Sequence, residues 1–381
     1  MNCVHGKLVY TGKGVVSDAY VVFDTQKLVG ISKSPRGRVE GRFPVITPAF
    51  IDAHSHIGLE RSGEPSAESE VNERLDLIAA VPDALDSIMM DDSSFKDSIE
   101  AGVLYSCVMP GSLNIISGRS AVIRNYARNT TEALVARAGI KGAIGYNPTS
   151  DKTKPGTRPM TRMGSMALLR RKLDEVRQKL DKLRKARGKK KDEITFSAEE
   201  EILRQVLEGR ERLRIHVHKI DDIAALLRVV DEFKFKLTVE HTCDVNDPHI
   251  YAELKRRGIP VVSGPMDSFA YKVELKHENW RNIRHLLASK VEFGLMTDHP
   301  VILQQTLLMT TRWFVRCGLT KQDAIELITR RNARILGVDR MLGTLERGKW
   351  ASFVCFSGDP FDLTKHPVAA FGEGTKLFAE D

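Results

Sequence analysis

An apolar segment near the start of the chain ends in two histidines separated by one residue, His54 and His56. Side chains two residues apart on a β-strand project from the same face, so both imidazoles can point at one centre. Neutral imidazoles are good ligands for zinc and for similar divalent metals. Taken alone, such a pair is more often two partly buried histidines that form hydrogen bonds, so the rest of the chain decides between the two interpretations.

Ligand-type residues close three further apolar segments. The segment Leu213–His218 carries His216 and His218 on one face, Leu237–His241 ends in His241, and Val291–Pro300 contains Asp298. Any one of these has an ordinary explanation, for example an aspartate that stabilises a turn before a proline. Four segment ends that supply histidine, histidine, histidine and aspartate together predict a metal site.

The elements that must position these residues are short, nearly continuous apolar runs, which are typical of strands buried on both faces of a parallel sheet. The expected strands are Val45–His54, Val103–Met109, Ala121–Ile123, Ile140–Tyr146, Leu213–Val217, Lys236–His241, Pro260–Ser263 and Val291–Met296. Helical patterns fall between several of them, at Thr130–Ala138, Met166–Lys185, Ala198–Gly209, Asp222–Phe233 and Asp247–Arg257. This number of strands predicts an α/β fold, a (β/α)8 TIM barrel, with its functional groups at the carboxyl ends of the strands.

Both ends of the chain have a different pattern. Short alternating segments separated by Gly and Ser fill residues 1–48, and a similar pattern returns after Gly343. Because strand edges need partners and chain ends often lie close together, we expect one small composite β-sandwich domain from both ends. The predicted domains are residues 1–48 with 340–381, and a barrel over residues 49–339.

Composition indicates an ordinary soluble protein and excludes a membrane span. Of the 381 residues, 42% are hydrophobic and 28% charged, and no apolar run is long enough to cross a bilayer. Five cysteines without a pairing rhythm favour reduced thiols and a cytoplasmic location.

A net charge of +8 raises the question of nucleic acid binding. Much of the basic charge lies in the run Arg170–Lys191, where leucines recur at helical spacing and acidic residues are interspersed. The run has no aromatic residue to stack on bases. We therefore expect a helix with a solvated basic face and no nucleic acid partner.

The motifs that contain these residues resemble the amidohydrolase superfamily of metal-dependent hydrolases. Residues 45–56 look like the family's first-strand motif, with Ala49 where glycine is usual. Residues 107–114, 117–121, 158–164 and 297–300 look like the branch related to imidazolonepropionase, and Gly348, Lys349 and 358–360 resemble the family's composite β-sandwich.

By this resemblance His54, His56, His216 and His241 are metal ligands, and Asp298 is the catalytic aspartate and a further ligand. On the fifth strand either His216 or His218 could be the ligand, and we favour His216. The resemblance implies a divalent metal, with zinc first and Fe, Mn, Co or Ni also suited to these ligands.

One departure from the family pattern bears on the number of ions. This branch usually closes its fourth strand with Gly-Glu-Asn-Pro, whereas here the sequence is Gly-Tyr-Asn-Pro, with Tyr146 at the acidic position. A neutral tyrosine cannot bridge two metals at ordinary pH. We expect one tightly held ion, with Tyr146 as a wall of the pocket. A site that has decayed into a scaffold is the alternative interpretation.

The resemblance implies hydrolysis of a C–N bond in a cyclic amide, a linear amide or an amidine, by metal-activated hydroxide with Asp298 as general base and acid. A deaminase of the same superfamily is the alternative enzyme. The small-molecule substrate would be bound by His218, Tyr146 and Arg119, and by loops at Leu59–Asn72, Pro110–Ser120, Tyr146–Thr161 and Gly264–Lys276. Arg61, Arg158, Arg162 and Lys272 are further candidates for an anionic substrate group. A homo-oligomer is expected by resemblance.

Overall fold

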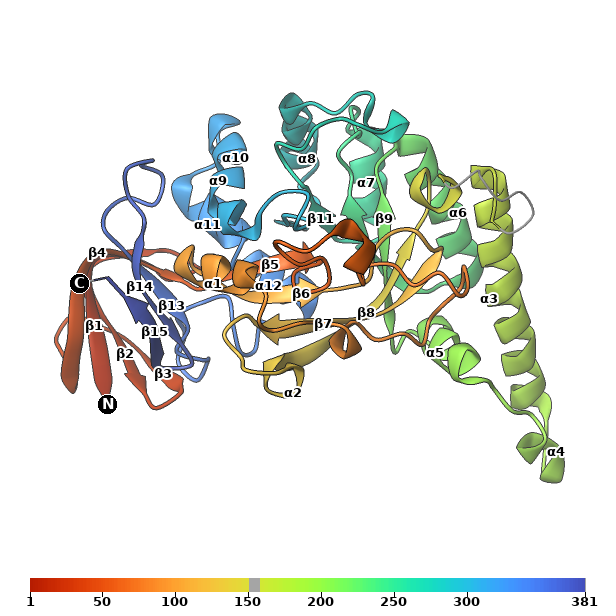
Figure 1. The fold of residues 1–381 in the computed structure, drawn as a ribbon, viewed down its shortest axis with the longest axis horizontal. Coiled ribbons are helices and arrows are strands. Elements are labelled where there is room, and N and C mark those ends of the chain that lie inside the picture. Colours follow the sequence, from red (N-terminus) through yellow and green to blue (C-terminus); the bar gives the residue numbers. More distant parts are fainter. Residues whose placement is uncertain (151–157, 381) are drawn as a thin grey trace.

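The structure is a computed structural model that describes residues 1–150 and 158–380. Two β-sheets organise the chain (Figure 1). A seven-stranded sheet lies at one end of the molecule, an eight-stranded sheet lies in the centre, and the long helix α3 (Arg162–Lys185) runs along the opposite end.

Both ends of the chain contribute strands to the seven-stranded sheet, as the sequence predicts, whereas a sandwich of two layers there stays a prediction. Its strands are β1 (Asn2–Tyr10), β2 (Val15–Asp24), β3 (Lys27–Ser32), β4 (Arg38–Pro48), β13 (Phe353–Phe356), β14 (Pro367–Gly372) and β15 (Thr375–Ala379), in the order β15-β14-β13-β4-β1-β2-β3. The antiparallel pair β4–β13 joins the two ends, and the rings of Phe23, Phe353 and Phe371 pack together in its core. The division of the chain into two domains stays a prediction.

The eight-stranded sheet forms the barrel. Its strands are β5 (Phe50–Ser55), β6 (Val103–Val108), β7 (Ile116–Arg124), β8 (Leu134–Ala143), β9 (Arg212–Val217), β10 (Lys236–His241), β11 (Val261–Ser263) and β12 (Phe293–Leu295), in the order β12-β11-β10-β9-β8-β7-β6-β5. Strands β8 to β12 are parallel to one another, so their carboxyl ends meet on one side of the sheet.

The barrel departs from eight parallel strands at one place, because β7 runs antiparallel to both β6 and β8. Only residues 109–115 connect β6 to β7, which is shorter than the dozen or so residues that a parallel crossover needs. The helix expected over Thr130–Ala138 is wrong beyond Ala133, because the antiparallel strands β7 and β8 need only a short connection. Helix α2 covers Thr130–Ala133, and the chain then enters β8.

The segment Val45–His54, expected as one strand, is divided between the two sheets. Strand β4 ends at Pro48 and β5 begins at Phe50. Between them the Ala49 amide donates to the carbonyl of Ser352. His54 and His56 therefore lie at the end of β5, the strand that directly follows β4 of the seven-stranded sheet.

Strands β5 and β12 are the edges of the eight-stranded sheet, and Asn332 links them. Its side-chain amide donates to the carbonyls of Ile51 (2.6 Å) and Leu295 (2.8 Å), and its oxygen accepts from the Leu295 amide (3.0 Å). A Cβ at Gly294 would lie 1.8 Å from Asn332 Oδ1, so only glycine fits there. The nearly closed barrel thus depends on a buried side chain at its seam.

Helices cover the barrel (Figure 1). Besides α2 and α3 they are α1 (Ser93–Glu100), α4 (Lys189–Asp192), α5 (Ala198–Leu207), α6 (Ile220–Phe233), α7 (His249–Arg256), α8 (Ile283–Ser289), α9 (Leu307–Thr310), α10 (Arg312–Arg316), α11 (Lys321–Leu327) and α12 (Arg330–Leu336). Within the described residues, none of the helices combines the length and the apolar character that a membrane crossing needs.

The basic run predicted as a helix forms most of α3, whose Leu169, Leu173 and Val176 are buried. Several of its basic side chains pair with acidic residues of neighbouring helices: Arg170 with Glu232, Lys172 with Glu199, and Lys179 with Glu200. Part of the charge that could attract nucleic acid is therefore balanced within the protein.

Candidate metal centre

Two groups of ligand-type side chains lie at the carboxyl ends of the barrel strands. His54 of β5 and His56, which directly follows β5, form one group with Asp298, which follows β12. His216 and His218 of the β9 end form the other with His241 of β10. Within each group the candidate ligand atoms lie within 4.8 Å of one another, and the rings of His54 and His241 are 4.9 Å apart between centroids. The four strand ends predicted from the sequence therefore converge.

Three of the histidines are held through Nδ1. His54 Nδ1 lies 3.2 Å from a Glu240 oxygen, His56 Nδ1 lies 2.7 Å from the Met109 carbonyl, and His241 Nδ1 lies 3.0 Å from the Gly264 carbonyl. Each acceptor fixes a ring in which Nδ1 carries the proton and Nε2 keeps its lone pair. Such partners orient the imidazoles of metal sites.

Unpartnered nitrogens mark the centre of the site. His241 Nε2, His216 Nδ1 and both ring nitrogens of His218 are buried without a hydrogen-bond partner in the described part of the chain. Burial holds the pKa of His54, His216, His218 and His241 well below its usual range, so all four rings are neutral near pH 7. Buried polar atoms normally have partners. Neutral, orphaned imidazoles fit a divalent metal.

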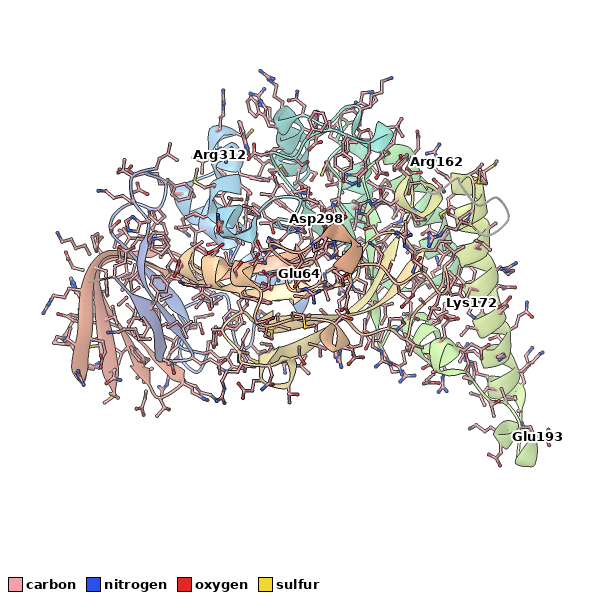
Figure 2. The ribbon with its side chains drawn as sticks, in the orientation of Figure 1. Glu64, Arg162, Lys172, Glu193, Asp298 and Arg312 are labelled. Atoms are coloured by element: carbon pink, nitrogen blue, oxygen red, sulfur yellow. The ribbon has the colours of Figure 1, made fainter. Side chains whose placement is uncertain are left out.

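Asp298 adopts a left-handed backbone conformation (φ 55°) directly after the last barrel strand. Its amide donates to the His54 carbonyl, and its Oδ1 lies 3.3 Å from His54 Nε2 and 3.2 Å from His56 Nε2. Figure 2 shows Asp298 near the middle of the molecule. The side chain is 14% exposed, so solvent reaches a carboxylate that is otherwise enclosed.

Asp52 positions the segment that carries Asp298. Its carboxylate accepts from the Thr297 amide (3.2 Å) and from the Gln304 side chain (3.0 Å), which ties this segment to β5. His299, the residue after Asp298, accepts at Nδ1 from the Gln304 amide. His299 therefore stabilises the turn that follows Asp298.

Lys141 is a site residue that the sequence analysis missed. It lies on β8, is completely buried, and places Nζ 3.2 Å from His54 Nε2. Burial lowers the pKa of its ammonium to about 8, although Asp298 and Glu240 favour the charged form. A lysine in the otherwise apolar run Ile140–Ile144 was the signal that could have identified it.

Glu240 and Arg214 are two further site residues that were not predicted from the sequence. They form a buried ion pair that contacts His54. Arg214 Nη1 lies 3.2 Å from Glu240 Oε1, and both side chains are buried. The other Glu240 oxygen contacts His54 Nδ1, so the pair sets the orientation of that ring. Burial raises the pKa of Glu240, while Arg214 favours its ionised form.

Tyr146 lies just beyond β8, and 36% of its surface is exposed. Its amide donates to a Glu274 oxygen at 3.0 Å. Lys141, not Tyr146, is the fourth-strand side chain that faces His54. A fourth-strand group that bridges two metals would therefore have to come from Lys141 and not from Tyr146.

Arg119 lies on the outer face of the eight-stranded sheet. It pairs with Ile140 of β8, and directly opposed residues of antiparallel strands share a face. Because the next residue, Lys141, faces His54, Ile140 and Arg119 face the other way. Arg119 lines a hollow with Ile202 of α5. The structure does not bring Arg119 to the histidines, because its side chain lies on the opposite face of the sheet from Lys141.

The other basic candidates for substrate binding already pair with acidic or polar groups of the protein. Among them, Lys272 is the one that lies close to the histidines. Arg61 pairs with Glu64, Arg162 pairs with Asp222, and Arg158 donates to the Leu113 carbonyl and to Asn114. Lys272 Nζ lies 3.6 Å from Glu274. Part of the expected loop Tyr146–Thr161, residues 151–157, lies outside the described residues.

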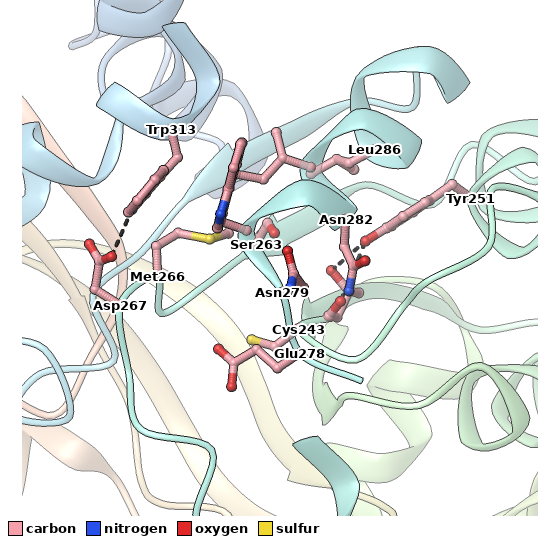
Figure 3. A pocket seen from close by; sticks show the side chains of 13 residues that line it. Cys243, Tyr251, Ser263, Met266, Asp267, Glu278, Asn279, Asn282, Leu286 and Trp313 are labelled. Carbon is pink, nitrogen blue, oxygen red and sulfur yellow. Dashed lines mark hydrogen bonds between the residues drawn. The ribbon is translucent and has the colours of Figure 1, made fainter. Parts of the chain in front are cut away.

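A small pocket lies beyond the end of β10, where Cys243 lines it (Figure 3). It encloses about 50 Å³ and is lined by residues that include Cys243, Ser263, Met266, Glu278, Trp280 and Trp313. The Gly264 carbonyl that accepts from His241 Nδ1 also accepts from the Cys243 thiol, so one carbonyl connects a site histidine to a residue that lines the pocket.

An α/β barrel with histidines and an aspartate at its strand ends is typical of metal-dependent hydrolases. The chain belongs to the amidohydrolase family, whose model matches residues 45–377. The family resemblance inferred from the motifs is thus confirmed, and members of this family bind a metal.

Individual relatives agree with this assignment. The chain is similar over its full length to the crystal structure of an amidohydrolase from Thermotoga maritima MSB8, with 29% identity, a TM-score of 0.92 and full coverage of both chains. It is 24% identical to amidohydrolase tasK of Hapsidospora irregularis over 87% of this chain, but spans only 36% of that protein's length. E. coli guanine deaminase shares the fold, at 14% identity, a TM-score of 0.54 and full coverage of both chains.

Proposed function

We propose that the protein is a metal-dependent amidohydrolase that hydrolyses a C–N bond in a small molecule, either a cyclic or linear amide or an amidine. The observation that carries this proposal is the convergence of neutral histidines, four of whose buried ring nitrogens lack a partner, beside a partly exposed aspartate. The motifs that resemble the imidazolonepropionase-related branch support a cyclic amide or a related substrate.

His54, His56, His216, His241 and Asp298 would hold the metal, with His218 beside them. A divalent ion supplies Lewis acidity for the scissile carbonyl or amidine carbon and lowers the pKa of water. Zinc suits these donors best, and Fe, Mn, Co and Ni are compatible.

Asp298 is the residue that would move protons. Its carboxylate is solvent-accessible on one side and lies beside His54 and His56 on the other, so it can accept a proton from the attacking water. The same carboxyl would then donate that proton to the leaving nitrogen. The rings of His54 and His56 beside it are anchored through Nδ1, which leaves Asp298 as the proton carrier.

Lys141 bears on the number of ions. An ammonium 3.2 Å from His54 Nε2 repels a cation held by that ring, so metal binding favours the neutral amine. A neutral amine supplies no negative charge between the two groups, and we therefore propose one tightly held ion. Two ions would call for an anionic bridge. A carbamate formed from the Lys141 amine and carbon dioxide would supply one, and intact mass measurement would reveal it.

Elemental analysis of the purified protein, combined with a screen of N-acyl amino acids, cyclic imides and amidines, tests the proposed function. We expect about one ion per chain and turnover that disappears when the metal is removed and returns when it is restored. Release of ammonia from an aminated heterocycle without amide hydrolysis would instead support a deaminase. Metal without turnover of any substrate class would support the scaffold interpretation.

A further inference from the structure

Glu274 is a buried carboxylate that the sequence analysis did not identify. It lies in the short helical turn Val273–Leu275, between β11 and α8. Glu274 is only 1% exposed, whereas its apolar neighbour Val273 is 67% exposed. Simple burial preferences favour the reverse arrangement, because a charged group is costly to bury without partners. The turn therefore places the Glu274 carboxylate inside the protein and leaves the Val273 side chain in solvent.

This carboxylate points at the histidine group on β9. Glu274 Oε1 lies 3.5 Å from His216 Nε2 and 3.8 Å from His218 Nε2. Neither distance is that of a good hydrogen bond, and Oε1 has no hydrogen-bond partner in the described part of the chain. Lys272 Nζ is 3.6 Å away. His216 Nε2 lies 3.2 Å from the Asn147 side-chain amide, whereas His218 Nε2 has no hydrogen-bond partner in the described residues. An unsatisfied carboxylate oxygen and an unsatisfied imidazole nitrogen thus face one another across a gap.

The surrounding backbone is arranged around Glu274. Its Oε2 accepts from the Tyr146 amide at 3.0 Å. A Cβ at Gly145 would lie 3.0 Å from the same oxygen, and Gly145 has a φ of +91°, so a side chain is excluded there twice over. The carboxylate from a distant loop therefore occupies the space beside position 146, where the sequence has a tyrosine and lacks an acid.

We propose that Glu274 is the anionic ligand that completes the His216–His218–His241 group for a divalent cation, in place of an acidic residue at position 146. The proposal rests on the proposed metal-dependent function. Histidine and glutamate side chains together form common zinc sites. A cation between them would satisfy Glu274 Oε1 and His218 Nε2, which both lack a hydrogen-bond partner in the described residues.

The full-length variant Glu274→Gln tests this role, because glutamine keeps the size and can still accept from the Tyr146 amide. Metal is first removed with a chelator, and Zn²⁺ affinity is then measured by competition with a chromophoric chelator. We expect at least about tenfold weaker binding than in the unmodified protein. We also expect the thermal midpoint of the metal-free variant to equal or exceed that of the metal-free parent, since a buried charge is gone.

Two matched variants separate this role from other ones. Glu278→Gln changes a carboxylate of the same loop that bonds Ser268, and it should alter Zn²⁺ affinity less than about twofold. Lys272→Met removes the nearby ammonium and should leave Zn²⁺ binding equal or tighter. If the Lys272–Glu274 ion pair were purely structural, Lys272→Met and Glu274→Gln would lose equal stability.

The outcomes are distinct. If the unmodified protein binds no Zn²⁺, the proposed function fails, and the role of Glu274 fails with it. If the unmodified protein binds Zn²⁺ and Glu274→Gln binds it equally well, only the role of Glu274 is overturned. An unchanged affinity with a raised KM would assign Glu274 to substrate binding instead.

Discussion

The Asp298 carboxylate lies within 3.3 Å of two imidazoles and still meets solvent. Asparagine has the same shape but cannot accept the proton, so we expect Asp298→Asn to lower kcat by about 10²- to 10⁴-fold. Bound metal should remain, because the histidine ligands are unchanged and asparagine keeps one oxygen at the position of the Asp298 carboxylate. Steady-state kinetics with parallel metal analysis measures both quantities, and the exposed substitution Asp362→Asn is the control. Unchanged turnover would remove Asp298 from the mechanism.

Lys141 gives the metal affinity a pH dependence. The pKa of its ammonium is lowered to about 8, and a nearby cation disfavours the charged form, so metal binding releases this proton. Below pH 8 the proton must be displaced, and affinity should fall by up to about tenfold per pH unit. Above this pKa the dependence on Lys141 disappears.

Zn²⁺ competition titrations between about pH 6.5 and 9 measure this slope. The variant Lys141→Met carries no proton at this position, so its Zn²⁺ affinity should be nearly flat across the same range. His54, His216, His218 and His241 are already neutral there, because burial depresses the pKa of each imidazole. An equal slope in both proteins would contradict the placement of Lys141 beside the ion.

At the scale of elements, the seam between β5 and β12 holds Asp298 against the first histidine pair. A Cβ at Gly294 would lie 1.8 Å from Asn332 Oδ1 and would break the hydrogen bonds that link Ile51 and Leu295. We expect Gly294→Ala to lower the free energy of unfolding by about 2–4 kcal/mol. Urea denaturation measures this change.

Gly14→Ala is the matched control, because a Cβ there meets nothing within 4 Å. Its free energy of unfolding should stay within about 0.5 kcal/mol of the parent value. Equal, small effects of the two substitutions would show that the seam does not depend on the Asn332 side chain.

Apolar runs predicted the barrel strands because burial on both faces leaves a direct mark on the sequence. Strand β10 spans Lys236–His241 as predicted, and β9 and β11 differ by one residue at one end. The reversed direction of β7 left no such mark, since direction depends on the lengths of connections. Arg119, expected in a loop that binds the substrate, lies on β7.

The missed site residues have a common cause. Lys141 and Glu240 are single charged residues inside apolar runs, and a pattern of hydrophobicity gives them little weight. Glu274 comes from a loop whose path depends on contacts with residues far away in the sequence, such as the Tyr146 amide. Histidines spaced by two residues could be predicted, whereas the carboxylates and the lysine that tune them required the three-dimensional structure.

At the scale of the whole molecule, the basic residues of α3 are partly neutralised by neighbouring helices. Binding to duplex DNA should therefore be weak at physiological salt, without the steep salt dependence of a protein that makes many phosphate contacts. A fluorescence anisotropy titration at two salt concentrations measures this. Tight binding that collapses with added salt would show that α3 presents a functional basic surface.

The central claim is that the barrel's histidines hold a divalent metal that the reaction requires. Elemental analysis of the chelator-stripped and Zn²⁺-reconstituted protein, beside the double variant His54→Ala/His241→Ala, tests it most directly. We predict about one tightly bound ion per chain in the parent protein and substoichiometric metal in the variant, with both proteins folded by circular dichroism. A parent protein that retains no metal, or a variant that retains as much as the parent, would contradict the claim.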